Sequence, residues 1–328
     1  LVTSVDGQLV KLTEDGSRRL LPGNQEPFRF PTFSSDGRLA AIQTRRSYDI
    51  IAVDPDEGGW ECLLCNTPRV GWGSVGPDGA VAHRLLQGDR TRIFVRAANG
   101  APHALTGVDE TASCPVFSPD GAKVAYLAQV DGVTELRVRL RDGGEPVTLA
   151  RGLENSEFVS WSPDGGSIAY AGGAPLRIWV VSAAGGDPIA VSGPGGDYPS
   201  FSPDGSLIAY SIWTEDSDPA QGTWLVPSGG GHSRKVSDLP TRVAWDPRSG
   251  DLLQLRRSAD DEFLELWRAD PADAIWSLRS VLDLGVRPPI QMEFRPLTVS
   301  PADGRLVMNR WAASSRLVVF EGIEPGRW

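Results

Sequence analysis

One short motif returns along the whole chain and constrains the fold more than any other feature. Each copy has an aromatic or apolar residue, a turn of the Ser-Pro-Asp-Gly type and then an alternating apolar segment. The seven copies, of which the sixth is degraded, begin at Phe33, Val75, Phe117, Trp161, Phe201, Trp245 and Val299. The aspartates of the first five turns are 42, 42, 44 and 40 residues apart. A steady period of this length indicates a repeat architecture.

Each repeat has room for four short strands. Pro-Asp-Gly favours a hairpin turn, because proline presets φ, aspartate bonds its own backbone and glycine accepts positive φ. The segments after the turn, such as 123–126 and 167–170, alternate as half-buried strands do. A third strand such as 176–181, a glycine-rich turn and a short fourth strand such as 146–149 complete the unit. Four strands in about 42 residues predict one blade of a β-propeller.

The repeats resemble those of TolB-like β-propellers, whose blades carry a Phe/Trp-Ser-Pro-Asp-Gly turn and an Ile-Ala-Tyr strand. Because the resemblance covers essentially the whole chain, we predict an all-β fold of four-stranded antiparallel blades in one domain, residues 1–328. It also implies a location in the periplasm or on the outer surface of a bacterium. Residues 297–322 are similar to the ends of bacterial TolB-like propellers fused to winged-helix regulators or Ser/Thr kinases. In those fusions the propeller is a sensory or interaction domain.

The number of blades follows from the two ends of the chain. Seven turn motifs are present, but eight segments fit a third strand, from 8–12 to 316–320. Residues 1–23 fit strands two to four of a blade, and the C-terminal residues fit strands one to three. Pairing the two ends would close the ring and remove exposed strand edges. We therefore predict seven blades, while two separate three-stranded end blades would give eight.

Charge and hydropathy exclude two classes of partner. The net charge is −10 and the isoelectric point about 4.9, so we expect no nucleic-acid partner, because phosphate binding needs a basic surface. No run of about 18 uncharged apolar residues occurs, so we expect no membrane insertion by this chain.

The chain begins at Leu1 rather than Met, which predicts either a removed leader or an excised part of a longer chain. We expect a monomer.

Cys62 and Cys65 form a CxxC pair. A zinc site would need a second pair or well-spaced histidines, and a redox motif would need the start of a helix. The sequence therefore predicts a local disulfide or two buried thiols. Because residues three apart on a regular strand face opposite ways, a disulfide would require a turn at this place.

Other motif matches have simpler explanations. Residues 71–76 fit a dinucleotide-binding pattern, but a blade turn follows instead of a helix. Residues 54–58 faintly resemble a calcium loop, yet Cys65 occupies the position that requires Glu. The Asp-Gly turns repeat, whereas an active site needs one asymmetric set of groups. His83, His103 and His232 lie in different repeats. We therefore predict no metal and no cofactor.

Candidate ligand contacts come from the geometry of a propeller. First strands line the central channel, and the loops that enter them form one face. Residues three and four places before each turn aromatic should therefore lie at the channel mouth. They differ between repeats and mix the aromatic and arginine side chains of recognition sites with acids. The candidates are Arg29, Phe30, Trp72, Glu157, Phe158, Asp197, Tyr198, Arg242 and Arg295, with Ser113 and Cys114 in the same places of another repeat.

Two functions fit these observations. Peptidases of the prolyl oligopeptidase class also carry propellers, but their chemistry lies in a hydrolase domain with a Gly-x-Ser-x-Gly motif, which is absent here. HExxH and Walker patterns are absent too. We predict a non-catalytic module that binds a protein or peptide, or acts as a sensor, in the periplasm or outside the cell. The alternative is a small-molecule lyase or hydrolase at the channel mouth, because propellers host both functions.

Overall fold

The structure is a computed structural model, and its described part consists entirely of strands, turns and loops. The residues it describes are 2–5, 8–12, 18–20, 28–33, 39–65, 67, 70–153, 158–214, 218–260, 262–283 and 297–320. Two compact units divide the chain, one of residues 48–310 and one of residues 1–47 with 311–328. That residues 1–328 behave as a single domain stays a prediction.

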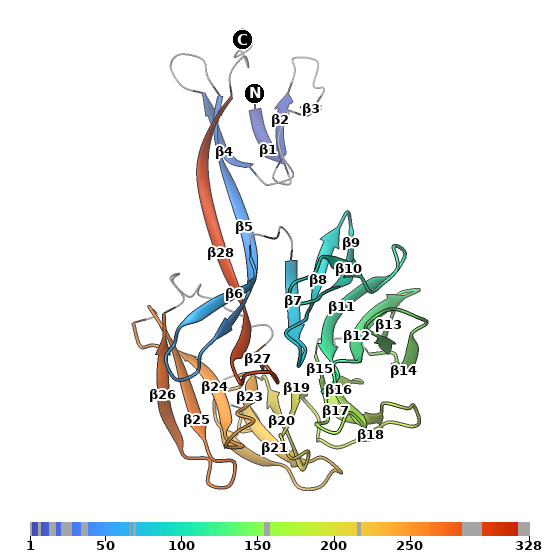
Figure 1. The fold of residues 1–328 in the computed structure, drawn as a ribbon. Helices are drawn as coiled ribbons and strands as arrows, with labels where there is room; N and C mark the ends of the chain where they lie inside the picture. Colours follow the sequence, from blue (N-terminus) through green and yellow to red (C-terminus); the bar gives the residue numbers. More distant parts are fainter. Residues whose placement is uncertain are drawn as a thin grey trace. The chain divides into compact units, whose positions relative to one another are not determined.

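Five four-stranded antiparallel sheets follow one another in the larger unit (Figure 1). In each sheet the strands are paired in chain order. The sheets are blade 1, β7 (Val70–Val75), β8 (Val81–Gln87), β9 (Arg90–Arg96), β10 (Pro102–Ala104); blade 2, β11 (Thr111–Phe117), β12 (Lys123–Val130), β13 (Val133–Leu140), β14 (Val147–Arg151); blade 3, β15 (Val159–Trp161), β16 (Ser167–Gly172), β17 (Arg177–Ser182), β18 (Ile189–Ala190); blade 4, β19 (Gly196–Phe201), β20 (Leu207–Ile212), β21 (Gly222–Pro227), β22 (Arg234–Ser237); and blade 5, β23 (Val243–Trp245), β24 (Leu252–Arg257), β25 (Leu264–Ala269), β26 (Trp276–Leu282).

A sixth blade combines strands from distant parts of the chain. β27 (Thr298–Val299) pairs with β28 (Leu306–Phe320), β28 is hydrogen-bonded to β5 (Leu39–Val53), and β5 pairs with β6 (Trp60–Leu64). In the smaller unit, β4 (Phe28–Phe33) pairs with the first residues of β5. There β1 (Val2–Val5), β2 (Gln8–Leu12) and β3 (Arg18–Leu20) form an antiparallel three-stranded sheet. Three strands in residues 1–23 agree with the sequence prediction.

The described ranges contain six blades, whereas the motif count predicts seven or eight. The difference arises at β5 and β28, where the repeat pattern predicts two strands joined by a turn and the structure has one continuous strand. Residues 43–48 and 311–315 contain no Gly, Pro, Asn or Asp, and of the residues that favour turns they have only Ser47, Ser314 and Ser315. Other blades have Asp131-Gly132 or Gly172-Gly173 at this point. The counts of seven and eight stay predictions, as does ring closure.

Hydrophobic side chains pack between successive blades. Ile93 and Val95 of blade 1 pack with Val124 and Tyr126 of blade 2, and similar clusters lie between the next pairs. Blade 6 packs on two neighbours. Its Ile51 and Met308 join a cluster with leucines of blade 5, and its Ile50 and Val307 join one with valines of blade 1. Each blade buries both faces against other blades, so the second strands are buried at consecutive positions, as at 124–128 and 168–172, and the predicted half-buried alternation is wrong for them.

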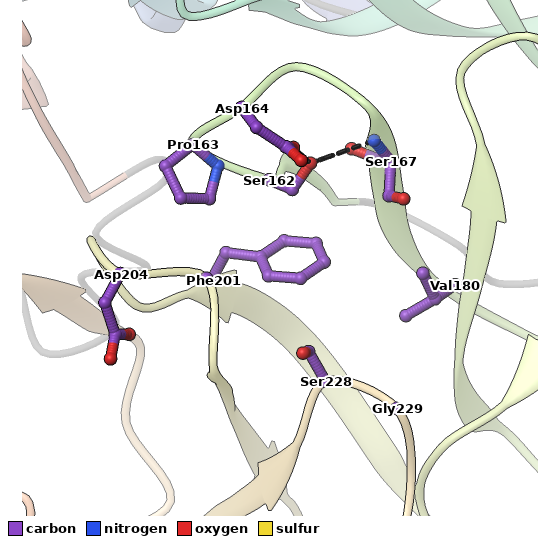
Figure 2. Close-up of a pocket in the computed structure, with 10 residues that line it drawn as sticks. Ser162, Pro163, Asp164, Ser167, Val180, Phe201, Asp204, Ser228 and Gly229 are labelled. Atoms are coloured by element: carbon purple, nitrogen blue, oxygen red, sulfur yellow. Dashed lines mark hydrogen bonds between the residues drawn. The ribbon is translucent and has the colours of Figure 1, made fainter.

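The Ser-Pro-Asp-Gly turns are closed by their own side chains (Figure 2). The Ser162 hydroxyl donates to Asp164 Oδ1 at 2.5 Å and accepts the Ser167 amide at 2.9 Å. The same bonds recur at Ser202, whose hydroxyl donates to Asp204 and accepts the Leu207 amide. Hydrogen bonds from Ser202 and Ser206 lower the pKa of Asp204 to about 2. The repeated motif is thus explained by turn formation.

Removing this serine hydroxyl should weaken the fold. In a Ser202→Ala variant the Leu207 amide loses its acceptor, so we expect the free energy of unfolding to fall by about 1–2 kcal/mol. Ser228→Ala is the matched control, because Ser228 lies near the same turn and is only half-buried, and it should change stability by less than about 0.5 kcal/mol. Urea unfolding of both variants measures the difference. Equal values would show that the hydroxyl is not a structural contact.

Candidate binding surface at the entry of the first strands

Three first strands carry a bulge at the same place. The register shifts between Gly71 and Gly73 in blade 1, between Ser113 and Val116 in blade 2, and between Asp197 and Ser200 in blade 4. Inside these bulges are Trp72, Cys114 and Tyr198, which have φ values of +37°, +54° and +56°. A non-glycine residue in this region costs about 1 kcal/mol or more. A bulge re-aims a side chain, so these residues leave the regular alternation of the strand.

Four of the predicted contacts, from four different blades, come together. Trp72 of blade 1 lies 6.1 Å from Phe158, which precedes blade 3, measured between ring centroids. Phe158 lies 4.6 Å from Tyr198 of blade 4. Arg242, which precedes blade 5, places its guanidinium carbon 4.8 Å from the Phe158 ring and 4.2 Å from the Tyr198 ring. All four side chains are partly exposed, so a ligand can reach them.

Two further residues belong to this group and were missed by the sequence analysis. The guanidinium carbon of Arg84, on β8, lies 4.4 Å from the Trp72 ring. Trp213 follows β20, lies 6.2 Å from Tyr198 in an edge-on arrangement and is 55% exposed. We call the six residues Trp72, Arg84, Phe158, Tyr198, Trp213 and Arg242 the mouth cluster.

The remaining candidates have other places. Asp197 is half-buried beside the cluster, and its Oδ1 accepts the Tyr198 amide at 2.8 Å. Cys114 is buried in the core between blades 2 and 3, against which Trp72 packs, and its neighbour Ser113 is half-buried. Arg29 and Phe30 lie on β4 in the smaller unit, and their side chains are outside the described residues. Glu157 and Arg295 also fall outside them.

The other end of the first strands has a different chemistry. A cavity of about 420 Å³ is lined by all six first strands and their turns, including Val116, Trp161, Phe201 and Trp245, and no charged side chain lines it. Its wall is held by bonds between blades, such as that from Trp161 Nε1 to the Val116 carbonyl at 3.1 Å. A groove of about 330 Å³ over Phe201 lies beside it between two turns (Figure 2). Of the described residues that line this cavity none is an arginine, whereas Arg84 and Arg242 belong to the mouth cluster.

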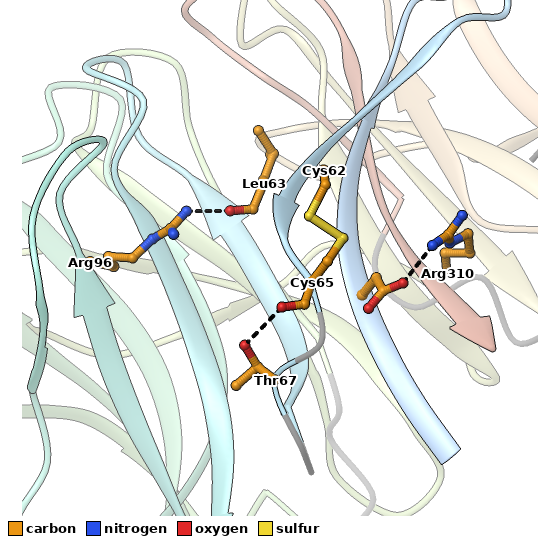
Figure 3. Close-up of a disulfide and its surroundings, with 7 residues drawn as sticks. Cys62, Leu63, Cys65, Thr67, Arg96 and Arg310 are labelled. Carbon is orange, nitrogen blue, oxygen red and sulfur yellow. Dashed lines mark hydrogen bonds and ion pairs between the residues drawn. A yellow bond between two sulfur atoms is a disulfide. The ribbon is translucent and has the colours of Figure 1, made fainter. Parts of the chain in front are cut away.

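A disulfide joins Cys62 and Cys65 (Figure 3). The register between β5 and β6 shifts between Ile50 and Ile51, which leaves Leu63 as an extra residue in β6. This bulge turns the second cysteine to the side of the first, as a bridge across three residues requires. Arg96 of blade 1 donates to the Leu63 carbonyl and holds the bulge. Of the two predicted alternatives, the structure contains the disulfide.

The three histidines differ in their burial. His83 is buried in blade 1 against Phe94, with ring centroids 6.0 Å apart, and burial lowers its pKa to about 4. His103 and His232 are exposed. Within the described ranges, no group of three or more His, Cys, Asp and Glu side chains is placed to hold a metal ion.

Two sequence patterns have structural explanations. Residues 71–76 lie on β7 and its turn, without a following helix. Asp54 caps the turn between β5 and β6, because its carboxylate accepts the amides of Asp56 and Glu57.

No helix in the described part of the chain is long and apolar enough to span a membrane.

Comparison with solved structures defines the class of fold. A TolB protein of Agrobacterium tumefaciens is 19% identical, with a TM-score of 0.63 over 82% of this chain and 99% of that one. TolB from Acinetobacter baumannii is 15% identical, with a TM-score of 0.56 over 86% and 80%. An oligogalacturonate lyase in complex with manganese is 12% identical, with a TM-score of 0.52 over 85% and 76%.

The chain therefore has a TolB-like β-propeller fold. No family model and no curated protein matches the sequence. Because the solved neighbours include both TolB proteins and a lyase, the fold does not decide the function, which must be argued from the mouth cluster.

Proposed function

We propose that this chain is a non-catalytic module that binds a protein or peptide partner at the mouth cluster. The observation that carries the proposal is the convergence of Trp72, Phe158, Tyr198 and Arg242 from four blades. Aromatic and arginine side chains dominate the binding energy of protein interfaces. Trp72 and Tyr198 are also held in a strained backbone conformation, and such strain gathers at functional sites.

The surroundings of the cluster support a binding role. Trp213 stands 55% exposed at its edge, and a large exposed aromatic side chain beside others is a feature of interaction sites. The core residues beneath are fixed by packing between blades, so the cluster rests on a rigid base. A rigid site loses little conformational entropy when it binds.

The proposal includes a location and an architecture. We place the domain outside the cytoplasm, supported by the Cys62–Cys65 disulfide, because disulfides persist in oxidising compartments. The resemblance to TolB-like propellers points the same way. We also propose that the blades form a closed ring as one monomeric module, supported by the packing of blade 6 on both blade 5 and blade 1.

Affinity capture from native extract tests the function. The wild-type chain is compared with a Trp72→Ala, Phe158→Ala, Arg242→Ala triple variant and with Arg256→Ala, a matched control. Arg256 makes the same kind of contact, 4.4 Å over Trp267, but lies within blade 5. A captured protein is identified by mass spectrometry, purified and titrated against each chain.

We expect the triple variant to lose at least about 100-fold in affinity and the control to keep it. Circular dichroism must first show that all three chains are folded. Binding that survives the triple variant would place the partner elsewhere. Turnover of a small molecule that the triple variant abolishes would favour the lyase or hydrolase alternative.

A further inference from the structure

We infer that the other end of the first strands is a second binding site, which takes a basic segment of a partner protein. In that segment an apolar side chain lies between two cationic ones. The site is separate from the proposed function, because it uses none of the residues of the mouth cluster. It consists of the cavity of about 420 Å³ and of two grooves that share the lining residues Phe201 and Trp245 with it. We call these three hollows the turn-face site.

The central cavity favours an apolar group. Trp161, Phe201 and Trp245 are in its wall, and no charged side chain lines it among the residues that the structure describes. Hydrogen bonds between blades already use several polar groups of the wall. The Ser160 hydroxyl accepts the Phe201 amide at 3.1 Å, and Trp245 Nε1 donates to the Ser200 carbonyl at 3.1 Å. An apolar side chain that enters the cavity gives up no hydrogen bond, so it gains from burial.

Two acidic grooves adjoin the cavity. The first, of about 330 Å³ between blades 3 and 4, lies over Phe201 and is lined by Asp164 and Asp204 (Figure 2). The second, of about 340 Å³ between blades 4 and 5, is lined by Asp204, Asp251 and Asp270. Within the described ranges no lysine, arginine or histidine lines either groove. The grooves therefore favour cationic groups on both sides of the apolar cavity.

Asp164 and Asp204 differ from the other aspartates of this face in their charge balance. In the part of the chain that the structure describes, neither forms an ion pair. In blade 2 the charge of Lys123 acts on Asp120, and blade 5 has Arg248 in the place of the turn aspartate. Three further carboxylates have arginine partners, namely Asp78 with Arg141 at 2.7 Å, Asp303 with Arg305 at 2.7 Å and Asp251 with Arg268 at 3.9 Å. The uncompensated negative charge of this face therefore lies at the first groove.

Both carboxylates of the first groove are exposed and ionised. Hydrogen bonds from the Ser162 hydroxyl and the Gly166 amide lower the pKa of Asp164, and the Ser202 hydroxyl makes the largest contribution to a pKa of about 2 at Asp204. A carboxylate has about four acceptor positions. In Asp164 both of these bonds end on Oδ1, at 2.5 and 2.9 Å. Its Oδ2 accepts none from the described residues, so it can meet a cation.

An arginine or lysine side chain suits the first groove. Pro163, Val180 and Phe201 line it beside the two carboxylates. Long cationic side chains lay their aliphatic stems on apolar surface and keep the charged end in polar surroundings. The stem would cover the Phe201 ring, and the charged end would meet Asp164 or Asp204. A bare cation would leave this apolar surface uncovered.

The rim of the site is open, which favours a segment of chain over an enclosed small molecule. Pro163, Pro247 and Pro301 line the central cavity and are exposed. Pockets for small molecules, in contrast, bury most of the surface of their ligand. Because the cavity shares lining residues with both grooves, all three hollows can be filled at once. A short basic segment with a central apolar residue has the side chains to fill them.

Isothermal titration with four probes tests this chemistry. The first is acetyl-Arg-Ala-Leu-Ala-Arg-amide, whose Arg and Leu side chains can point the same way. Glu replaces Arg in the second, Ser replaces Leu in the third, and the fourth is putrescine, a dication that lacks the leucine. We expect the first peptide to bind at least about tenfold more tightly than each of the others. Equal binding of any other probe, or no binding of the first peptide, would overturn the inference.

Asparagine substitutions assign the effect to the two carboxylates. Asp164→Asn and Asp204→Asn keep an oxygen for the turn but remove the charge, so each should weaken binding of the first peptide about three- to fivefold. The double variant should lose about tenfold or more. Asp120→Asn is the matched control, because Asp120 closes the same turn in blade 2 but lines none of the three hollows. It should bind as the wild type does, and an equal loss in this variant would mean that only the net charge acts.

A photoreactive leucine analogue in the first peptide locates the site on the wild-type protein. We expect it to label Trp161, Phe201 or Trp245, which line the central cavity, and to do so equally in the triple variant of the mouth cluster. Labelling confined to the mouth cluster would overturn the inference. The proposed function is tested separately, since it predicts what the triple variant loses, whereas the turn-face site is what that variant keeps.

Discussion

Replacing Gly222 by alanine is expected to lower the free energy of unfolding by about 3 kcal/mol or more. Gly222 opens β21 with φ +137°, a conformation that L side chains rarely adopt. A Cβ atom there would overlap the Ser237 carbonyl oxygen and the Lys235 side chain. Because the overlap with Ser237 involves backbone on a paired strand, relief requires breaking the pairing of β21 with β22.

Gly229→Ala is the matched control in the same blade. An added Cβ at Gly229 meets nothing within 4 Å, so the free energy of unfolding should change by less than about 0.5 kcal/mol. Urea unfolding followed by tryptophan fluorescence measures both variants. A Gly222→Ala variant as stable as the control would mean that the turn before β21 has another conformation.

The second large effect is a loss of stability in mild acid caused by His83. Burial lowers the pKa of His83 to about 4 from its ordinary value of 6.5. The unfolded chain therefore takes up this proton first as the pH falls. Stability is complete above pH 6.5, decreases between 6.5 and 4 and changes no further below 4 on account of this residue. At about 1.36 kcal/mol per pKa unit the loss is roughly 3 kcal/mol.

A His83→Gln variant should remove most of this dependence. Gln254 occupies the corresponding place in blade 5, which shows that an amide side chain fits this position of a blade. His103→Gln is the control, because His103 is exposed, and it should keep the wild-type pH profile. Urea unfolding at several pH values between 7 and 4 gives the profiles. Parallel profiles for wild type and His83→Gln would contradict the assignment.

The turns of the larger unit could be predicted because their determinants are local. Ser118, Pro119, Asp120 and Gly121 close one turn with bonds among themselves and to the next two residues. The pairing of β28 with β5 joins segments from the two ends of the chain, so it has no local determinant in the sequence. β5 is hydrogen-bonded to both β28 and β6, to the latter through residues 50–53, and nothing in the repeat spacing shows that β5 runs on instead of turning. The missing turn residues at 43–48 were the available signal.

The candidate site was predicted in part for a similar reason. Counting back from the turn aromatic finds Trp72, Phe158, Tyr198 and Arg242, because each lies three residues before the residue that opens its turn motif, although the first strands range from two to seven residues. Arg84 lies on the second strand, in a place taken by Leu127, Ala171, Ser211 and Leu255 in other blades. A charge at an otherwise apolar or small position would have revealed it. Trp213 lies beyond its strand, where no repeat rule applies.

The mixed origin of blade 6 has a consequence for biosynthesis. Its strands come from residues 49–64 and 298–310, so this sheet cannot assemble until nearly all of the chain has left the ribosome. Blades 1 to 5 contain only neighbouring segments and can form one after another during translation. Contacts between such distant segments form slowly, because closing a long loop costs entropy before any contact is gained. Until then Ile51 lacks its contacts with Leu306 and Met308, and exposed apolar surface of this kind makes an incomplete chain prone to aggregation.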